Sequence, residues 1–178
     1  MDFAKWMEEQ SALPDARQFS YIACVLDKIS QDHLEAAARK WLFENFGHDV
    51  PPDWTWRSHH MTVLFRQGGI LTTDLEKYRN FFGEDVKLHI TGIAADDNIM
   101  AARVQPSEKF EIQAAVPHIT IAHSKRVGPN DSNRLLMDQG KIQAAQAVEL
   151  ISVFAAVKRD QVSIWPEKSF PLATPVRS

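Results

Sequence analysis

Two short stretches of the sequence decide the fold. Residues 58–65 read SHHMTVLF, and residues 116–123 read VPHITIAH. Successive side chains of a β-strand point to opposite faces, so His60 and Thr62 share one face of the first stretch. His118 and Thr120 share one face of the second stretch in the same way. The opposite faces carry apolar residues that require a core: Met61, Val63, Phe65, Ile119 and Ile121.

The segments around these stretches predict more strands than helices. We expect further strands at residues 19–26, 86–95, 99–105 and 148–165, and helices at 31–46 and 73–82. Residues 96–98 have a tight-turn composition that predicts a hairpin, and residues 159–160 predict the turn of a second hairpin. A helix over residues 143–157 stays an alternative, because alanines suit either state. The pattern favours an antiparallel α+β domain over a parallel doubly wound one.

The helix expected at residues 31–46 has a signal at each end. Ser30 precedes it and is the expected N-cap, since a serine hydroxyl can accept a hydrogen bond from a free backbone N–H. Gly47 follows it, in the position where a glycine ends a helix in a left-handed conformation. The apolar positions between them recur at helical spacing, so this helix should pack against a sheet.

Composition and charge limit what the chain can bind. The 178 residues include 20 Lys and Arg against 23 Asp and Glu, a formal net charge of −3. No long basic run is present, so long duplex DNA is not an expected partner. The only cysteine, Cys24, lies in an apolar run, which excludes an internal disulfide. No apolar stretch approaches the ~20 residues of a membrane span, so we expect no membrane partner.

The length predicts one globular domain. We expect residues 1–18 to form an N-terminal leader, because Pro14 and its polar neighbours suggest loose attachment, and residues 19–178 to form the domain. The N-terminus lacks the apolar core of a signal peptide. A cytoplasmic protein is therefore expected, in the host cytoplasm if a phage encodes it. The sequence determines no oligomeric state.

The two histidine motifs resemble the signature of a known superfamily. Residues 60–63 (HMTV) and 118–121 (HITI) match the His-x-Thr/Ser-x-hydrophobic strands of the two-histidine (2H) phosphoesterases. Their separation of 58 residues leaves room for the helix and hairpin that this fold puts between them. The resemblance covers roughly residues 19–165. It implies an α+β fold of two pseudo-symmetric lobes, each an antiparallel sheet backed by helices, with His60 and His118 facing each other across a central cleft.

The residue types in the motifs suit metal-independent cleavage of a phosphodiester. One histidine would act as base on the attacking oxygen and the other as acid on the leaving oxygen, since an imidazole pKa of about 6.5 allows either role near neutral pH. Thr62 and Thr120 would donate hydrogen bonds to the non-bridging oxygens and stabilise their charge. The expected catalytic set is therefore His60, Thr62, His118 and Thr120, and we expect neither a metal nor another cofactor.

Side chains that flank the motifs could hold the rest of a nucleotide. Aromatic rings can stack on a base, and cations can meet phosphates. The candidates are Trp54, Trp56, Arg57, Arg66, Lys125 and Arg126. Ser132 follows the second motif and could line the cleft, although a helix N-cap explains it equally well. The expected substrate-binding set is Trp56, Lys125, Arg126 and Ser132, each of which also has an ordinary packing or solvated-charge interpretation.

A third His-x-Thr segment competes with the two motifs. His89 begins it and lies 29 residues from each of the other two histidines. That distance is too short for a full lobe between His89 and His60, and Gly92 occupies the next position of the motif. We therefore expect His89 to be structural.

Zinc binding is the competing interpretation of the histidines. The candidate pairs are His59 with His60 and His118 with His123. Adjacent residues and residues five apart point to opposite faces of a strand, so neither pair can converge on one ion without a bulge. No metal site is therefore expected, and a hydrogen bond is the expected role of His59 and His123.

The resemblance implies hydrolysis or cyclisation at a ribose-linked phosphodiester. The substrate classes are 2′,3′-cyclic phosphates at RNA ends, 2′-5′ linkages and cyclic nucleotide signals. The short acidic chain suits a small nucleotide or an RNA end, and we expect a cyclic oligonucleotide, as cleaved by anti-CBASS members that phages use, ahead of RNA. The alternatives are a non-catalytic nucleotide- or RNA-binding module on the same fold, and a structural protein. The intact pair of motifs favours the enzyme, since a binding module needs no second proton-transfer group.

Overall fold

An antiparallel sheet organises the chain in the computed structural model, which describes residues 13–105, 108–144, 148–160 and 163–167. The strand order is β2-β6-β5-β4-β7-β1-β3, and β8 pairs with β7 beside this path. Three α-helices, α2, α3 and α4, accompany the sheet within the described ranges. The expected antiparallel α+β class is confirmed.

The strands and helices lie close to their expected positions. The strands are β1 (Phe19–Leu26), β2 (Thr55–Trp56), β3 (His60–Phe65), β4 (Asp85–Ala95), β5 (Ile99–Val104), β6 (His118–His123), β7 (Val148–Lys158) and β8 (Ile164–Trp165). The helices are α2 (Lys28–Phe46), α3 (Thr72–Lys77) and α4 (Asp131–Met137), with 3-10 turns η1 (Ala16–Gln18), η2 (Arg79–Phe81) and η3 (Gln139–Lys141). Residues 148–157 lie in the strand β7, so the helix alternative for residues 143–157 is wrong over these residues.

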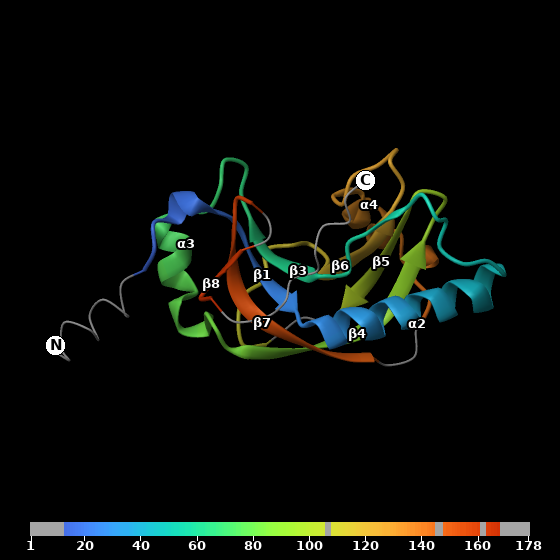
Figure 1. Cartoon of the computed structure of the whole chain (residues 1–178), viewed down its shortest axis with the longest axis horizontal. Helices are drawn as coiled ribbons and strands as arrows, with labels where there is room; N and C mark the ends of the chain where they lie inside the picture. Colours follow the sequence, from blue (N-terminus) through green and yellow to red (C-terminus); the bar gives the residue numbers. More distant parts are fainter. Residues whose placement is uncertain (1–12, 106–107, 145–147, 161–162, 168–178) are drawn as a thin grey trace, which may run out of the picture.

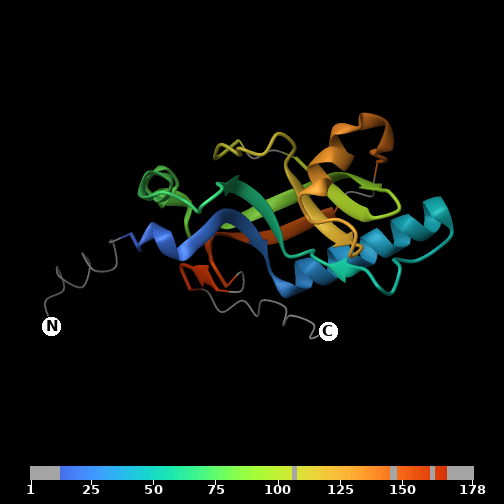
Figure 2. The same ribbon diagram turned by 90° about the horizontal axis from the view of Figure 1, so that it is seen from above.

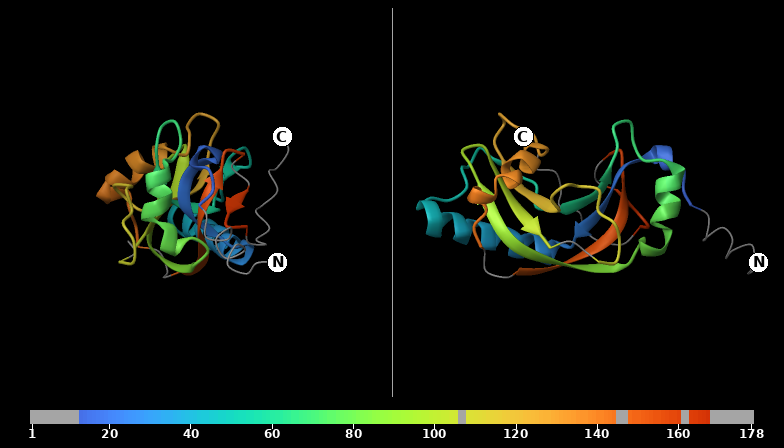
Figure 3. Two further views of the ribbon diagram at one scale, coloured as in Figure 1. Left: turned by 90° about the vertical axis from the view of Figure 1, so that its left-hand side faces the viewer. Right: turned by 180° about the vertical axis from the view of Figure 1, so that it is seen from behind.

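The long strands β4 and β7 run along the length of the molecule (Figure 1). The first half of β4 pairs with β7, and its second half pairs with β5. The second half of β7 pairs with β1. β4 and β7 therefore connect β1 and β3, toward one end of the molecule, with β5 and β6 toward the other (Figure 3). β3, at one end of the strand order, and β6, next to the other end, come side by side, although no ladder joins them (Figures 1 and 2).

The start of α2 is fixed by a different residue from the one expected. The Asp27 carboxylate accepts a 2.6 Å hydrogen bond from the backbone N–H of Ser30, which makes Asp27 the N-cap. The prediction that Ser30 is the cap is wrong, because the helix begins before it. The Ser30 hydroxyl instead accepts a 2.8 Å hydrogen bond from the N–H of Ile151 and ties the helix to β7. At the other end, Gly47 takes the expected left-handed conformation, with φ 75°.

The helices cover different parts of the sheet. α3 lies at one end of the molecule, and α2 and α4 lie toward the other (Figures 1 and 3). The side chains that α2 buries against the sheet are Leu34, Ala38, Trp41 and Leu42. Within the described ranges, the helices are too short or too polar to cross a membrane.

One face of the sheet carries the main core, and two smaller apolar clusters lie on the opposite face. Alternate residues of β1 show the division, since Ile22 and Cys24 join the main core while Ala23 and Val25 point away from it. The β1–β7 cluster consists of Tyr21, Ala23, Val25, Val153, Ala155, Val157 and Ile164. The β5–α4 cluster consists of Ala94, Ile99, Ala101, Leu135 and Leu136. The histidine and threonine side chains of the two motifs lie on this second face.

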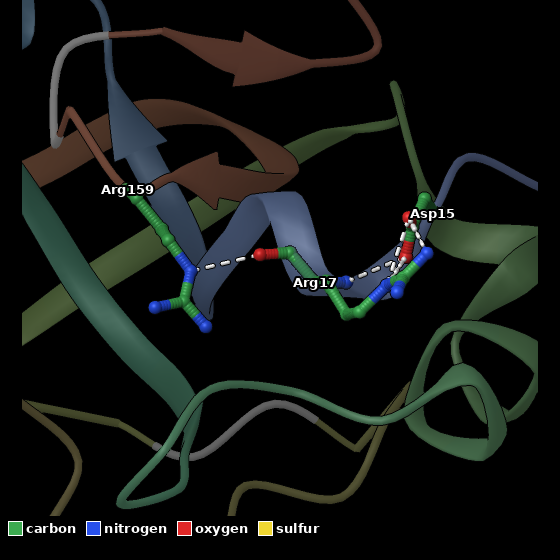
Figure 4. Close-up of polar contacts among 3 residues, drawn as sticks. All are labelled: Asp15, Arg17 and Arg159. Carbon is green, nitrogen blue, oxygen red and sulfur yellow. Dashed lines mark hydrogen bonds and ion pairs between the residues drawn. The ribbon is translucent and has the colours of Figure 1, made fainter.

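The described part of the expected leader packs on the domain. Ala16 is buried, and Leu13 packs against the main core. The backbone carbonyl oxygen of Arg17 accepts a 2.8 Å hydrogen bond from Nε of Arg159, whereas the Arg17 side chain pairs with Asp15 (Figure 4). The rest of the leader, residues 1–12, lies outside the described residues.

Candidate active site

The two motifs place four polar side chains on the face opposite the main core. His60 and Thr62 of β3 stand opposite Val25 and Ala23 of β1, and Thr120 of β6 stands opposite Ala101 of β5. Residues paired directly across antiparallel strands point to the same side. All four motif side chains are part-exposed, whereas the apolar residues that alternate with them are buried: Met61, Val63, Ile119 and Ile121.

Each motif strand contains a bulge directly after its threonine. Val63 is the extra residue in β3, between pairs that oppose consecutive residues of β1. Ile121 is the extra residue in β6, between pairs that oppose consecutive residues of β5. A bulge reverses the alternation of the strand beyond it. Phe65 and His123, the fifth residues after the motif histidines, therefore both turn to the motif face.

Two predictions from simple alternation are corrected by these bulges. Phe65 was expected in the core, but its side chain is 62% exposed. His123 was expected to face away from His118, but it stands opposite Ile99 of the β5–α4 cluster, on the same face as Thr120.

Residues 57–59 hold the two motifs together. β2 pairs with β6 while β3 pairs with β1, so the chain crosses between the two strands in these residues. The N–H of Arg57 donates a 2.7 Å hydrogen bond to the carbonyl oxygen of Ile121, and the N–H of Leu26 donates a 2.8 Å bond to the carbonyl oxygen of His59. Both sides of the crossing are thereby fixed, and β3 is kept beside β6.

His60 is packed among aromatic rings. Its imidazole stacks on the Tyr21 ring with the ring centroids 5.0 Å apart. The His59 ring packs against it in a T-shaped arrangement with the centroids 4.5 Å apart. Its Nδ1 is buried and has no hydrogen-bond partner among the described residues. Burial holds the pKa of His60 well below its usual 6.5, and positive charge on His59, His118 and Arg57 lowers it further. His60 is therefore neutral near pH 7, and the influence of His118 reflects the closeness of the two motif histidines.

His118 is oriented by the backbone that precedes its strand. Its Nδ1 lies 2.7 Å from the carbonyl oxygen of Val116. Because a carbonyl oxygen only accepts, Nδ1 carries a proton and donates it, which leaves Nε2 to exchange protons with a ligand. Burial lowers the pKa of His118, and the bond to Val116 partly opposes this shift.

The two threonines differ in how they are held. The Thr120 hydroxyl lies 3.3 Å from the carbonyl oxygen of Pro129 and 2.8 Å from the Ser132 hydroxyl. Since the carbonyl oxygen only accepts, Thr120 donates to Pro129 and accepts from Ser132, which is fully buried on α4. Within the described ranges the Thr62 hydroxyl has no such partner. Thr120 is thus restrained by α4, and Thr62 is left to bind elsewhere.

A comparison with families of known proteins matches residues 56–162 to the fungal tRNA ligase phosphodiesterase domain. The match spans more than half of the chain and includes both histidine motifs. The chain belongs to this family. The fungal tRNA ligase phosphodiesterase family is part of the 2H phosphoesterase superfamily, so the resemblance carried by the two motifs is confirmed. A search of curated proteins finds no match.

In this member of the fungal tRNA ligase phosphodiesterase family, one of the four expected substrate-binding residues contacts a motif side chain. Ser132 does so through its hydroxyl. Trp56 packs against the main core, where the guanidinium carbon of Arg39 on α2 lies 4.5 Å from its ring centroid. Lys125 and Arg126 are exposed in the turn after β6. The ring of Trp56 therefore lies away from the motif face.

The third His-x-Thr segment lies on β4, in the middle of the sheet. His89 is exposed and stands opposite Glu149 of β7, with Nε2 and Oε2 3.9 Å apart. The two motif histidines are instead part-buried, His60 on β3 at one end of the strand order and His118 on β6, next to the other end. Within the described ranges, no three His, Cys, Asp or Glu side chains gather as ligands for an ion.

Two further neighbours of the motifs have no strong sequence signal. Tyr21 belongs to an apolar run, and nothing local marks it as the ring that stacks on His60. Burial raises the pKa of Tyr21 to about 12, although the charge of Arg57 nearby lowers it, so the phenol stays neutral. Arg57 is one of several cations near the motifs in the sequence, and only the strand pairing places it between them.

Proposed function

We propose that this chain is a metal-independent 2′,3′-cyclic phosphodiesterase that acts on RNA ends through His60 and His118. The carrying observation is that two part-buried histidines, each followed by a part-exposed threonine, lie on one face of two strands that the 57–59 crossing holds side by side. Membership of a family described as a tRNA ligase phosphodiesterase domain supports an RNA end as the substrate.

The reaction needs one proton removed and one delivered. The base takes a proton from water, whose oxygen attacks the phosphorus of the cyclic phosphate. One of the two ribose P–O bonds then breaks, and the acid protonates the oxygen that leaves. The product is a phosphate monoester with a free hydroxyl beside it. Thr62 would donate to a non-bridging oxygen as its charge grows, and Thr120 would do the same by turning its hydroxyl proton from Pro129 to the phosphate.

The different surroundings of the histidines support a division of these roles. His60 is the harder of the two to protonate, because burial and the neighbouring His59 and Arg57 disfavour its cation. His118 has a carbonyl acceptor on Nδ1, which favours its cation. In the singly protonated pair the proton therefore resides on His118, so His60 is assigned as the base and His118 as the acid.

The matching bulges support a second part of the proposal, two pseudo-symmetric lobes around a central cleft. Val63 and Ile121 occupy the same position relative to their motif histidines. Each motif strand also lies beside its own apolar cluster, the β1–β7 cluster for β3 and the β5–α4 cluster for β6. A pair of equivalent strands is what such a symmetry requires.

The expected preference for a cyclic oligonucleotide has no support from the family match. The fungal tRNA ligase phosphodiesterase description favours an RNA end, and the anti-CBASS role is left without an observation of its own. The same two-histidine chemistry serves either linkage, so the substrate must be found by direct comparison.

A substrate panel tests the proposal. The protein is incubated in EDTA with a 2′,3′-cyclic mononucleotide, an RNA oligomer ending in a 2′,3′-cyclic phosphate, a 2′-5′-linked dinucleotide and cyclic oligonucleotides. We expect the cyclic-phosphate RNA end to be opened fastest, with nearly all turnover lost in His60→Ala and in His118→Ala. Tight binding without turnover of any substrate would identify a binding module and overturn the enzyme assignment. Preferred cleavage of a cyclic oligonucleotide would overturn the RNA-end assignment.

A further inference from the structure

Arg57 occupies a fixed position between the two motifs. Its backbone N–H is bonded to Ile121 in β6, and its carbonyl oxygen accepts a 2.7 Å hydrogen bond from the N–H of His59. The backbone of Arg57 is therefore held at the point where the chain passes from its pairing with β6 to its pairing with β1.

The guanidinium of Arg57 lies on the motif face. Its Nε is 3.5 Å from Nε2 of His123, which the bulge in β6 has turned to that face. Its charge acts on the phenol of Tyr21 and on the imidazoles of His59 and His60. One cation is thus placed near residues of β1, β3 and β6.

His123 is held in the tautomer that receives Arg57. Its Nδ1 lies 2.8 Å from the carbonyl oxygen of Ser124, so Nδ1 must donate. With Nδ1 as the donor, Nε2 faces Nε of Arg57 and can accept its hydrogen bond. His123 is buried, the bond to Ser124 orients its ring, and the ring presents Nε2 to the Arg57 side chain.

No carboxylate of the described residues compensates the charge of Arg57. Among the described residues no carboxylate forms an ion pair with it, and the titratable groups that it contacts or influences are imidazoles and a phenol that stays neutral. A part-buried cation without a counter-charge is costly, and it also makes protonation of His60 harder. A bound phosphate would compensate the charge of Arg57 and would ease the protonation of His60. Guanidinium is the cation whose paired donors suit phosphate oxygens.

We propose that Arg57 binds a non-bridging phosphate oxygen of the substrate and that His123 is a positioning residue that orients it. This inference rests on the proposed phosphodiesterase function and adds a charged group to the site. Nε of Arg57 stays on His123, and the terminal nitrogens donate to the phosphate beside His60. The cation stabilises the charge that builds on the phosphate oxygens in the transition state.

Inorganic phosphate titrations test the binding without requiring turnover. Phosphate binding is measured by calorimetry for the wild type, Arg57→Gln and Arg57→Lys. We expect Arg57→Gln to weaken binding by about 10-fold or more, from the loss of charge-assisted hydrogen bonds. Arg57→Lys keeps the charge and loses the paired donors, so its affinity should fall between the two. Arg17→Gln removes the same charge from an exposed side chain that contacts Asp15, and it should bind phosphate as the wild type does.

Two substitutions of His123 separate positioning from packing. His123→Gln can place an amide oxygen near the position of Nε2 and keep the acceptor for Arg57. His123→Asn can place an amide N–H near the position of Nδ1, keeping the donor to Ser124 and losing that acceptor. We expect phosphate binding and kcat/KM to fall in His123→Asn and to be rescued in His123→Gln. Equal losses in the two variants would leave His123 a packing role and overturn its positioning role.

The outcomes distinguish this inference from the proposed function. A wild type that turns over no cyclic phosphate would defeat the function, whereas phosphate affinity that is unchanged in Arg57→Gln would defeat the assignment of Arg57. No phosphate binding by the wild type, or an equal loss in Arg17→Gln, would defeat it as well. If Arg57→Gln does not fold by circular dichroism, Arg57→Lys decides, with weakened binding in support and wild-type binding against.

Discussion

The backbone N–H of Arg57 donates a 2.7 Å hydrogen bond to the carbonyl oxygen of Ile121. These residues are far apart in sequence, and Ile121 is the bulged residue directly after the second motif. The bond therefore joins the segment directly before the first His-x-Thr strand to the middle of the second. It also places one arginine beside both strands, where an anionic substrate would meet His60 and His118.

Alanine substitutions of the three His-x-Thr histidines should separate the motifs. His60→Ala and His118→Ala should each lower kcat by about 10² to 10⁴, the usual cost of losing one proton-transfer group. His89→Ala should have little effect, because His89 is an exposed residue opposite Glu149. Initial rates on the cyclic-phosphate RNA end provide the measurement. A loss in His89→Ala equal to the other two would show that the motifs are wrongly paired.

Chelation should leave the activity intact. The proposed acid, base and oxyanion donors are all side chains of the protein, so no step depends on a bound ion. We expect the same kcat before and after exhaustive dialysis against EDTA. Loss of activity that zinc or manganese restores would assign the reaction to metal-assisted hydrolysis instead.

The rate should rise and then fall with pH. The competent form has one histidine neutral and the other protonated, so both the fully protonated and the fully deprotonated pairs should be inactive. The two limbs would report macroscopic constants of the coupled pair. Because burial lowers the pKa of both histidines, the ligand-free profile of kcat/KM should be centred below the usual imidazole value of 6.5.

The same pH series contains its own control. Thr62→Val should lower the rate without moving either limb, because a hydroxyl carries no titrating proton in this range. A wild-type rate that climbs steadily to high pH, under conditions where chemistry limits turnover, would mean that no protonated histidine takes part.

Acid should weaken the fold through the motif histidines. The pKa of His60 in the folded protein lies well below the 6.5 of the unfolded chain, and that of His118 is lowered too. Below about pH 6.5 the unfolded chain therefore binds more protons, so the free energy of unfolding decreases as the pH falls. Above that pH both states are neutral at these rings, and their contribution is constant.

Urea unfolding at several pH values between 5 and 8 measures this dependence. His60→Gln should remove the contribution of His60 and flatten the slope below about pH 6.5. Carboxylates titrate in both proteins, so their contribution to the pH dependence of the unfolding free energy cancels in the comparison. Identical slopes in the variant and the wild type would show that the imidazole is as easily protonated in the folded state as in the unfolded one.

Ser132→Ala should act on the reaction through Thr120. The buried Ser132 hydroxyl donates to Thr120, so its loss leaves the Thr120 oxygen without its 2.8 Å partner. We expect a loss of about 1 kcal/mol in unfolding free energy, typical of one hydrogen bond, together with a reduced kcat. Thr120→Ser keeps the hydroxyl and should retain more activity than Thr120→Val. If Ser132→Ala lowers stability and leaves kcat unchanged, the contact is purely structural.

The elements that depend on local patterns could be predicted from the sequence. Alternation identified β3 and β6, helical spacing and Gly47 identified α2, and the turn at residues 96–98 identified the β4–β5 hairpin. The doublet of His-x-Thr motifs was enough to indicate the 2H superfamily, because its spacing and flanking pattern are written along the chain.

Which side chains meet at the motifs depends on long-range strand pairing and could not be predicted from the sequence. The bulges at Val63 and Ile121 turned Phe65 and His123 to the motif face, because a bulge arises from the register between two strands and leaves no mark in the alternation of one. Trp56 was placed on the core side by its packing against Arg39 of α2, although its sequence position is close to His60. Arg57 became a neighbour of both motifs because β2 pairs with β6 while β3 pairs with β1. That exchange of partners is a property of the folded sheet, since it depends on contacts between residues that the chain keeps far apart.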